Sequence, residues 1–230
     1  MSNLLTPATS FIELGGPVVA ILIGVSVFAL ALIGIKLGMF MAWKVGAHGN
    51  GKRALDHWER GDRDGAITLL EGRRSALDQS LLAGMKQLAR GDKFKEDVEE
   101  TIGAVALKKL HELQRGFRTL EAIAQLAPLL GLFGTVLGMI DAFQKLQTAG
   151  NSVDPSILAG GIWVALLTTA AGLAVAMPVS LVLTWFETRL EDERVAIQTL
   201  SSDLLNGGEG VSTSTVSADE TSGMEPAYAT

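Results

Sequence analysis

Three long apolar runs dominate the pattern of hydrophobic and polar positions along the chain. They cover Gly15–Ile35, Ala122–Ile140 and Ile157–Phe186, and they contain no Asp, Glu, Lys, Arg or His. A run of roughly 18 or more apolar residues predicts a transmembrane helix, because about 20 residues rising 1.5 Å each cross a hydrocarbon core of about 30 Å. A soluble protein with unusually apolar core helices is the alternative, which three uncharged runs disfavour. The pattern predicts an all-α integral membrane protein with three transmembrane helices.

The segment between the first two runs carries the pattern of amphipathic helices. Apolar side chains recur there at mostly helical spacing, and the Gly-Asp pairs that begin at Gly61 and Gly91 predict turns, so a local helix pair is expected. From Lys95 the apolar positions continue into the second run without a turn signal, which predicts one helix of roughly 50 residues, about 75 Å long. Such long cytoplasmic extensions need neighbouring helices to cover their apolar stripe. Pro128 lies within this helix, where a missing backbone donor can kink it.

Basic residues indicate the orientation in the membrane. Of the 19 Lys and Arg residues, 15 lie between Lys44 and Arg118. Because such residues concentrate on the cytoplasmic side, this segment and the C-terminus are expected in the cytoplasm and the N-terminus in the periplasm. No Lys or Arg precedes Lys36, and the first run is too long for a signal peptide, so the first span is expected to be retained.

After the third run, a charged stretch predicts a helix that returns along the cytoplasmic side, and the last residues hold too few large apolar side chains to form a core. The predicted segments are a periplasmic N-terminal segment (1–14), transmembrane helix 1 (15–43), a cytoplasmic helical region (44–121), transmembrane helix 2 (122–143), a periplasmic loop (144–156), transmembrane helix 3 (157–186), a cytoplasmic C-terminal helix (187–205) and a disordered tail (206–230).

Composition excludes several kinds of chemistry. The chain has no cysteine, which excludes disulfides and thiolate metal sites. His48, His57 and His111 lie far apart without metal-ligand spacing, and no phosphate-binding loop of the G-x-x-x-x-G-K type occurs. No nucleophile–base constellation is visible. We therefore predict no catalytic residue, no metal, no cofactor and no nucleic-acid partner, and we expect that the protein is not an enzyme.

Small residues form a stripe along one face of the second span and of the third span. The stripe of the second span comprises Gly131, Thr135, Gly138 and Ala142, with Gly134 and Gly138 forming a GxxxG beside it. The stripe of the third span comprises Ala165, Thr169, Gly172, Ala176 and Ser180, with Thr168 adjacent.

Two interpretations of these stripes are open. Small residues let membrane helices approach closely, so the stripes can be packing faces only. A threonine on each stripe, Thr135 and Thr169, instead suggests that both helices line a polar pathway. Proton relays in membranes normally use an ionisable side chain, which both spans lack. If the chain conducts protons, the titrating carboxylate must come from a partner helix that faces these hydroxyls and the small residues around them.

The stretches "LAPLLGLFGTVLGMIDAF" (126–143) and "GGIWVALLTTAAGLAVAMP" (160–178) resemble the paired signatures of the MotA/TolQ/ExbB proton-channel family. The order and spacing of the spans are similar too, so the resemblance covers roughly residues 10 to 205. Three spans resemble the ExbB/TolQ branch, since the MotA-type stators have four, and the second-span signature favours an ExbB-like protein.

This resemblance implies a homopentamer in the bacterial inner membrane, with the second and third spans around a central pore. Two helices of an ExbD- or TolR-like single-span partner would sit in that pore, and an aspartate of the partner would exchange protons beside the threonines. The proton-motive force would then act on a TonB- or TolA-like protein that spans the periplasm. Thr135 and Thr169 match the polar pore threonines of the family, and Thr168 adjoins them.

One position departs from the family pattern. Members commonly carry a glutamate in the third-span signature, in a G-I-x-E-A-L pattern, and this chain has Val164 at that place. The implied ring of carboxylates is therefore missing. Two explanations are open: the glutamate is dispensable for transport, or this chain couples differently, for example to Na⁺ in place of H⁺.

The main hypothesis is a non-enzymatic motor subunit that energises TonB-dependent transport across the outer membrane. A TolQ-like subunit of the Tol-Pal system and a purely structural membrane scaffold are the alternatives. A solute carrier is disfavoured, because the chain has neither inverted repeats nor a broken-helix binding site.

Overall fold

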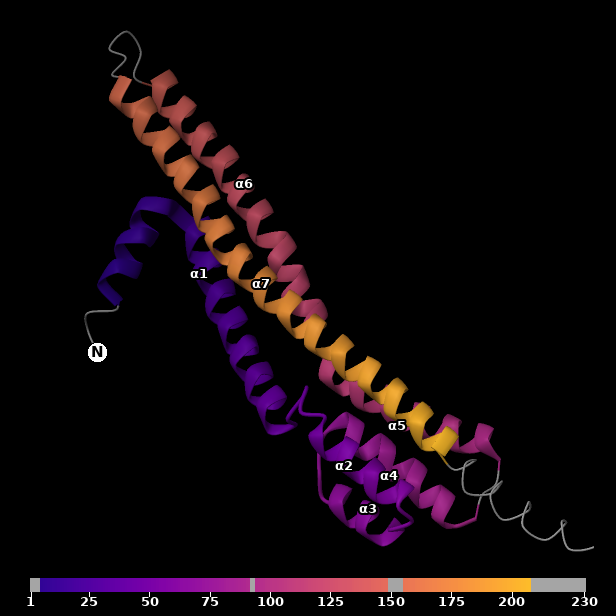
Figure 1. Cartoon of the computed structure of the whole chain (residues 1–230). Coiled ribbons are helices and arrows are strands. Elements are labelled where there is room, and N and C mark those ends of the chain that lie inside the picture. The colour runs from indigo at the N-terminus through magenta and orange to yellow at the C-terminus, as the bar shows by residue number, and fades with distance from the viewer. Residues whose placement is uncertain (1–4, 92–93, 149–154, 208–230) are drawn as a thin grey trace, which may run out of the picture. The chain divides into compact units, whose positions relative to one another are not determined.

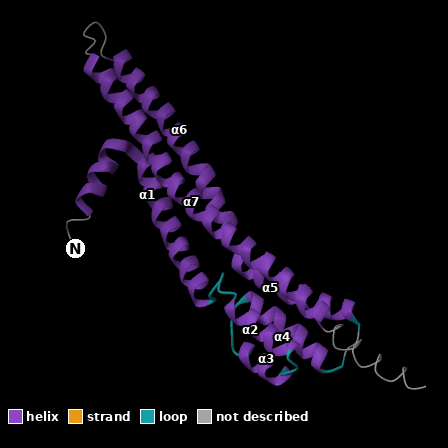
Figure 2. Ribbon diagram, viewed as in Figure 1, coloured by secondary structure: helices purple, strands orange, loops and turns teal. Residues whose placement is uncertain are grey.

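The computed structural model of the chain describes residues 5–91, 94–148 and 155–207, and every element in this part is a helix (Figures 1 and 2). The elements in chain order are α1 (Leu5–Ala42), α2 (Gly49–Glu59), α3 (Arg63–Leu70), α4 (Ala76–Ala89), α5 (Lys95–Gln114), α6 (Phe117–Thr148) and α7 (Pro155–Gly207). The predicted all-α class is confirmed. Most of the predicted tail, from residue 208, and residues 149–154 of the predicted loop lie outside the described residues.

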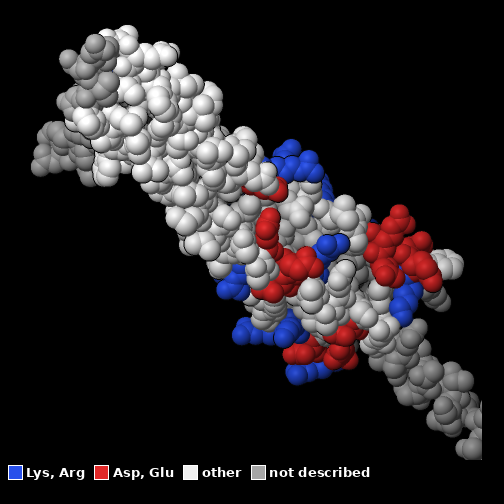
Figure 3. All heavy atoms as spheres, turned by 90° about the horizontal axis from the view of Figure 1, so that it is seen from above, with Lys and Arg blue, Asp and Glu red and all other residues white. Residues whose placement is uncertain are grey.

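The chain divides into two compact units. A membrane unit comprises residues 1–38 and 114–187, and a charged unit comprises residues 39–113 and 188–230. On the face shown in Figure 3, the Lys, Arg, Asp and Glu side chains gather on one part of the surface and leave another part free of charge. Of the 44 such residues in the sequence, only 9 fall within the ranges of the membrane unit. The two units therefore suit different solvents, lipid for one and water for the other.

The membrane unit holds the three spans that the hydrophobic pattern predicts. Helices long and apolar enough to cross a membrane occur within Gly16–Ala42, Lys95–Thr148 and Leu158–Gly207, which confirms three candidate spans. Many of their large apolar side chains, such as Leu132, Leu166 and Leu181, are exposed in the single chain. These faces are available for lipid or for further protein.

The prediction of one unbroken helix from Lys95 into the second span is wrong. α5 ends at Gln114, and α6 begins at Phe117. Between them Gly116 has a φ of +89°, a left-handed conformation that glycine adopts without steric cost and that commonly ends a helix. Apolar periodicity conceals this break, because it continues on both sides of the glycine. α6 itself continues through Pro128.

The third span and the charged stretch after it form a single helix. α7 runs for 53 residues from Pro155 to Gly207, so the charged stretch continues the helix of the third span. The expectation of a helix that returns along the cytoplasmic side differs from this arrangement. The physical reason lies in the sequence between Trp185 and Arg194, which contains neither glycine nor proline to end the helix.

The charged unit contains α2, α3, α4, most of α5 and the end of α7 around one apolar core. The turns predicted at Gly61 and Gly91 are confirmed, with φ of +85° and +91°. A further turn at Gly72, with φ of +73°, separates α3 from α4, so the segment forms three short helices where a pair was expected. The core of this unit buries Leu55, Leu70, Leu77, Leu81, Met85, Val98, Ile102, Ile197, Leu200 and Leu204.

Candidate functional site

The small residues of the second and third spans bring α6 and α7 of one chain into close contact (Figure 1). A Cβ atom at Gly131 would lie 2.8 Å from the carbonyl oxygen of Thr168, and a Cβ at Gly172 would lie 2.5 Å from the carbonyl oxygen of Ala127. Both neighbours are backbone atoms, which cannot rotate away. Glycine is therefore required at these two positions if the helices are to keep this separation.

The same interface continues along both helices. A Cβ at Gly138 would meet Ala165 at 3.2 Å, and a Cβ at Gly134 would meet the side chain of Thr168 at 2.7 Å. Ala176 is buried in the small apolar core of the membrane unit, together with Val18, Leu22 and Ala127. The structure thus places the predicted small residues against neighbouring helices of the same chain, while their contact with a partner helix stays a prediction.

Two threonine hydroxyls converge on one backbone carbonyl at the centre of this interface. Thr168 is 2% exposed, and its hydroxyl donates to the carbonyl oxygens of Gly131 at 3.1 Å and Ala165 at 2.7 Å. Thr169 is only partly buried, and its hydroxyl donates to the Gly131 carbonyl at 3.4 Å. Hydrogen bonds between membrane helices contribute about 0.6 kcal/mol each on average, so they orient the helices more than they stabilise them.

Thr135 lies at the flank of the interface and keeps part of its surface exposed. Its hydroxyl donates to the carbonyl oxygen of Leu132 at 2.6 Å, one turn back in α6. Its lone pairs remain able to accept a hydrogen bond. Thr135 and Thr169 are therefore better placed than Thr168 to meet a group from outside the chain, because Thr168 is enclosed by α6.

Val164, which is predicted to replace the family glutamate, is partly buried in α7, next to Ala165. No ionisable side chain occurs in the described residues 122–140 and 158–186 of α6 and α7. Among the described residues, no group of three or more His, Asp or Glu side chains is arranged to hold a metal ion. This candidate site therefore supplies hydroxyls, carbonyls and close packing, and its own residues supply no titrating group.

A charged residue of the first span is buried in the membrane unit. Lys36 is 7% exposed, and its ammonium nitrogen lies 5.7 Å from the centroid of the Phe117 ring. The Phe117 ring stacks on Phe186 at 5.8 Å between centroids. A cation over an aromatic face is attracted by the ring quadrupole, so this contact ties the end of the first span to the start of α6.

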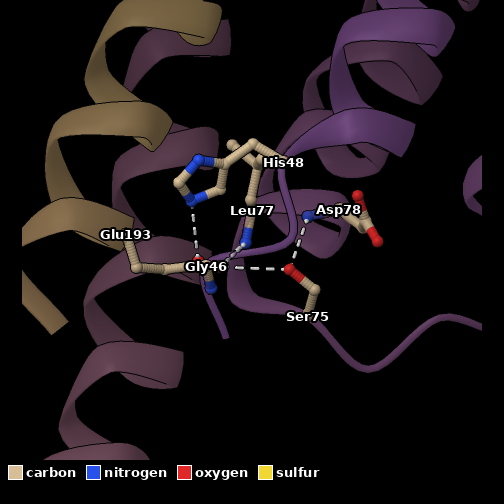
Figure 4. Close-up of polar contacts among 6 residues, drawn as sticks. All are labelled: Gly46, His48, Ser75, Leu77, Asp78 and Glu193. Carbon is tan, nitrogen blue, oxygen red and sulfur yellow. Dashed lines mark hydrogen bonds and ion pairs between the residues drawn. The ribbon is translucent and has the colours of Figure 1, made fainter. Parts of the chain in front are cut away.

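A second polar centre, in the charged unit, was missed by reasoning from the sequence, which predicts only a charged helix after the third span. Glu193 of α7 is 0% exposed (Figure 4). Its Oε1 accepts hydrogen bonds from the Ser75 hydroxyl at 3.0 Å and the Leu77 amide at 3.2 Å. Its Oε2 accepts from the Gly46 amide at 3.0 Å and lies 3.2 Å from Nε2 of His48. The carboxylate thus joins α7 to the turn before α2 and to the start of α4.

Asp78 lies beside this centre and is 3% exposed. Its Oδ1 has no hydrogen-bond partner among the described residues. Burial raises the pKa of Asp78, opposed by the nearby Arg73 and reinforced by Glu193. When folding raises the pKa of an acid, the unfolded chain releases the proton at a lower pH than the folded chain does. The free energy of unfolding therefore decreases as the pH rises from the ordinary pKa of about 3.9 through the raised value.

Replacing Asp78 by asparagine is therefore expected to raise the unfolding temperature of the full chain in detergent by a few degrees at pH 7. The gain should shrink as the pH is lowered toward 4, because the wild-type carboxyl then becomes neutral as well. Asp64→Asn is the matched control, since Asp64 is an exposed acid in the first turn of α3. A thermal scan in which both variants behave alike, or in which the gain is independent of pH, would contradict the expectation.

Comparison with known proteins connects the α6–α7 pair to a family. A model of the MotA/TolQ/ExbB proton channel family matches residues 73–199, which are 127 of the 230 residues. The chain belongs to this family. The matched region contains both glycine- and threonine-bearing spans. Of the second polar centre it contains Glu193, Ser75 and Leu77, whereas Gly46 and His48 precede it.

Individual relatives come from both the ExbB and the TolQ groups. The biopolymer transport protein exbB1 of Vibrio cholerae is 38% identical over 99 residues, 43% of this chain and 43% of that protein. The Tol-Pal system protein TolQ of Haemophilus influenzae is 31% identical over 132 residues, 53% of this chain and 58% of that protein. The biopolymer transport protein ExbB of Xanthomonas campestris is 28% identical over 163 residues, 64% of each chain. The chain spans less than two thirds of the length of each of these relatives.

Proposed function

We propose that this chain is the channel subunit of an ion-driven motor in the bacterial inner membrane. The observation that carries the proposal is the α6–α7 pair, in which hydroxyls and a carbonyl gather at a close helix contact without any ionisable side chain. Such a wall is polar but cannot itself take up a proton, so it needs a carboxylate from a partner. A single-span partner of ExbD or TolR type, with an acidic residue in its membrane helix, would supply that group.

The assembly that we propose is a ring of five copies around two partner helices, with the N-terminus in the periplasm and the C-terminus in the cytoplasm. Exposed apolar side chains on α6 and α7, including Leu132 and Leu166, provide surface for neighbouring subunits. A head-to-tail contact between identical chains closes into a ring if the rotation per subunit permits it. Thr135 and Thr169, which are both only partly buried in the single chain, would then face the partner. Val164 would leave that ring without carboxylates of its own.

The work that we propose for this motor is to energise TonB-dependent transport across the outer membrane. The biopolymer transport proteins of V. cholerae and X. campestris, both ExbB by name, support this choice. A TolQ-like role in envelope integrity and division is the second candidate, supported by the similarity to TolQ of H. influenzae. A structural scaffold is the third, because the small residues already pack within one chain.

The test is to co-express the full chain with a single-span protein of ExbD or TolR type that carries a membrane aspartate, and to determine the mass of the purified complex by native mass spectrometry. We expect five copies of this chain and two of the partner. Complementation then separates the candidates: a TonB-type subunit restores energised uptake in a host without its own subunit, and a TolQ-type subunit restores detergent resistance. A chain that purifies without a partner and restores neither phenotype would favour the scaffold.

A further inference from the structure

An apolar groove lies between α1 and α7 within the membrane unit. It has a volume of about 320 Å³ and is lined by apolar side chains of both helices, namely Ile33, Leu37, Leu181, Val182, Trp185 and Phe186. Leu181 is 73% exposed and Trp185 is 45% exposed, so the groove is open along its side. The two helices therefore leave a space that only an apolar group fills favourably.

The groove reaches the level at which the membrane unit ends. Leu37, Trp185 and Phe186 lie within one helical turn of the boundaries of this unit at residues 38 and 187, whereas Ile33 and Leu181 lie one to two turns further into the spans. Tryptophan is typical of the membrane–water interface, because its ring is apolar and its N–H is polar. The groove thus extends from the hydrocarbon region to the level of the lipid headgroups.

Two cations gather at this end of the groove. The Lys36 ammonium lies 5.7 Å from the centroid of the Phe117 ring, which stacks on the lining residue Phe186. A Cβ at Gly116 would lie 3.4 Å from Cε of Lys36, so the turn before α6 packs against the lysine. The same turn carries Arg115, which is exposed and near enough for its positive charge to oppose that of Lys36. An anion bound here would reduce the repulsion between the two like charges.

The remaining charges at this level leave one positive charge in excess. Arg118, exposed in the first turn of α6, is a third cation, and Glu121 and Glu187 are exposed acids. Residues 31–38, 114–121 and 180–187, all of which the structure describes, contain no further Asp, Glu, Lys, Arg or His. Lys and Arg residues near a membrane surface attract anionic lipids. A headgroup with a single net negative charge therefore suits this end of the groove better than a zwitterionic one.

We propose that the groove between α1 and α7 binds an anionic phospholipid of the phosphatidylglycerol type. One acyl chain occupies the apolar groove, and the phosphate binds the exposed guanidinium groups of Arg115 and Arg118, with the Lys36 cation behind them. The lipid fills the space between the first and third spans and holds α1 to α7. This inference concerns the outer contact of α1 and does not depend on the proposed ion pathway.

The fluorescence of Trp185 reports on the groove that this residue lines. The full chain is reconstituted in phosphatidylcholine vesicles that contain a small fraction of phosphatidylglycerol with brominated acyl chains, because bromine quenches tryptophan on contact. Phosphatidylethanolamine with the same brominated chains is the zwitterionic comparison. The difference between the wild type and Trp185→Phe isolates the signal of Trp185. We expect phosphatidylglycerol to associate at least roughly fivefold more strongly, since each cation near an anionic lipid contributes about that factor.

Trp163 provides a reference within the same helix. It is 64% exposed near the start of α7 and does not line the groove. Its signal, isolated with Trp163→Phe, should be quenched equally by the two brominated lipids.

Substitutions separate the headgroup site from the acyl-chain site. Arg115→Gln and Arg118→Gln should each weaken the association of phosphatidylglycerol by roughly fivefold and leave that of phosphatidylethanolamine unchanged. Lys145→Gln is the matched control, because Lys145 is an exposed cation near the opposite end of α6.

Filling the groove tests the acyl-chain site. Val182→Phe should reduce the quenching of Trp185 by both lipids, because the added ring occupies the groove. Val27→Phe should leave it unchanged, since Val27 is an exposed residue of α1 outside the groove.

Three outcomes would overturn the lipid site. Equal quenching of Trp185 by the two brominated lipids would mean that the groove meets only the bulk bilayer. A preference for phosphatidylglycerol that persists in the double variant Arg115→Gln/Arg118→Gln would remove the headgroup site. A Trp185 that neither lipid quenches would show that protein, such as a second copy of the chain, covers the groove. If Val182→Phe does not fold, the two arginine variants decide the question, because both side chains are exposed.

Discussion

Replacing Thr169 by valine is expected to reduce energised transport by at least about tenfold while the complex still assembles. Valine is nearly isosteric with threonine but lacks the hydroxyl that would hydrogen-bond the partner's carboxylate. A hydrogen bond to a charged group contributes about 1.5–3 kcal/mol, and about 1.4 kcal/mol corresponds to tenfold in rate. The hydroxyl bond to Gly131 is long, at 3.4 Å, so its loss should cost little stability. The measurement is the rate of uptake in a host that depends on this chain and its partner, alongside the yield of the complex.

Two further valine substitutions make this prediction specific. Thr199 lies in the same helix, is exposed, and bonds the carbonyl of Val195 one turn back, so Thr199→Val should leave transport unchanged. Thr168 is enclosed between α6 and α7 and makes two hydrogen bonds, so Thr168→Val should lower thermal stability as well as transport. Normal transport in the Thr169→Val chain would remove the hydroxyl from the ion pathway and strengthen the scaffold alternative.

The helices and the close helix contact could be predicted from the sequence because their determinants are local and periodic. Apolar runs of sufficient length specify the spans, and small residues three and four apart specify a face. The same reasoning could not rank two adjacent threonines. Thr168 and Thr169 lie three and four residues after Ala165, so both fall on nearly the same face of the helix. The packing of α6 against α7 places Thr168 at the centre of their interface.

The break at Gly116 and the burial of Glu193 show two different limits of such reasoning. Gly116 is a local signal, but the apolar pattern on either side conceals it. Glu193 has no local signal, because its partners Gly46 and Leu77 lie 147 and 116 residues away and bind it through backbone amides, which every residue but proline possesses. Nothing in the charged run that follows the third span distinguishes Glu193 from its acidic neighbours Glu191 and Asp192. Only the tertiary arrangement of the charged unit makes it a buried centre.

Replacing Gly172 by alanine is expected to destabilise the α6–α7 pair by about 1–3 kcal/mol, the usual cost of overpacking. The added Cβ would lie 2.5 Å from the Ala127 carbonyl oxygen and 3.2 Å from the Gly131 Cα, so the two backbones must move apart. Lipid gives membrane helices no hydrophobic drive to associate, so close packing is the main attraction that such a shift removes. Heating the detergent-solubilised complex before size-exclusion chromatography should show a lower unfolding temperature and less assembled protein.

Gly160→Ala provides the control within the same helix, because a Cβ at Gly160 meets no atom within 4 Å in the chain. Alanine favours a helix by up to about 1 kcal/mol over glycine, so this chain should be as stable as the wild type or slightly more stable. The contrast isolates the close approach at Gly172 from helix propensity, which both substitutions change alike. Equal behaviour of the two variants would show that α6 and α7 do not depend on this contact, and the hydroxyls of Thr168 and Thr169 would then lack the rigid wall that holds them against the Gly131 carbonyl.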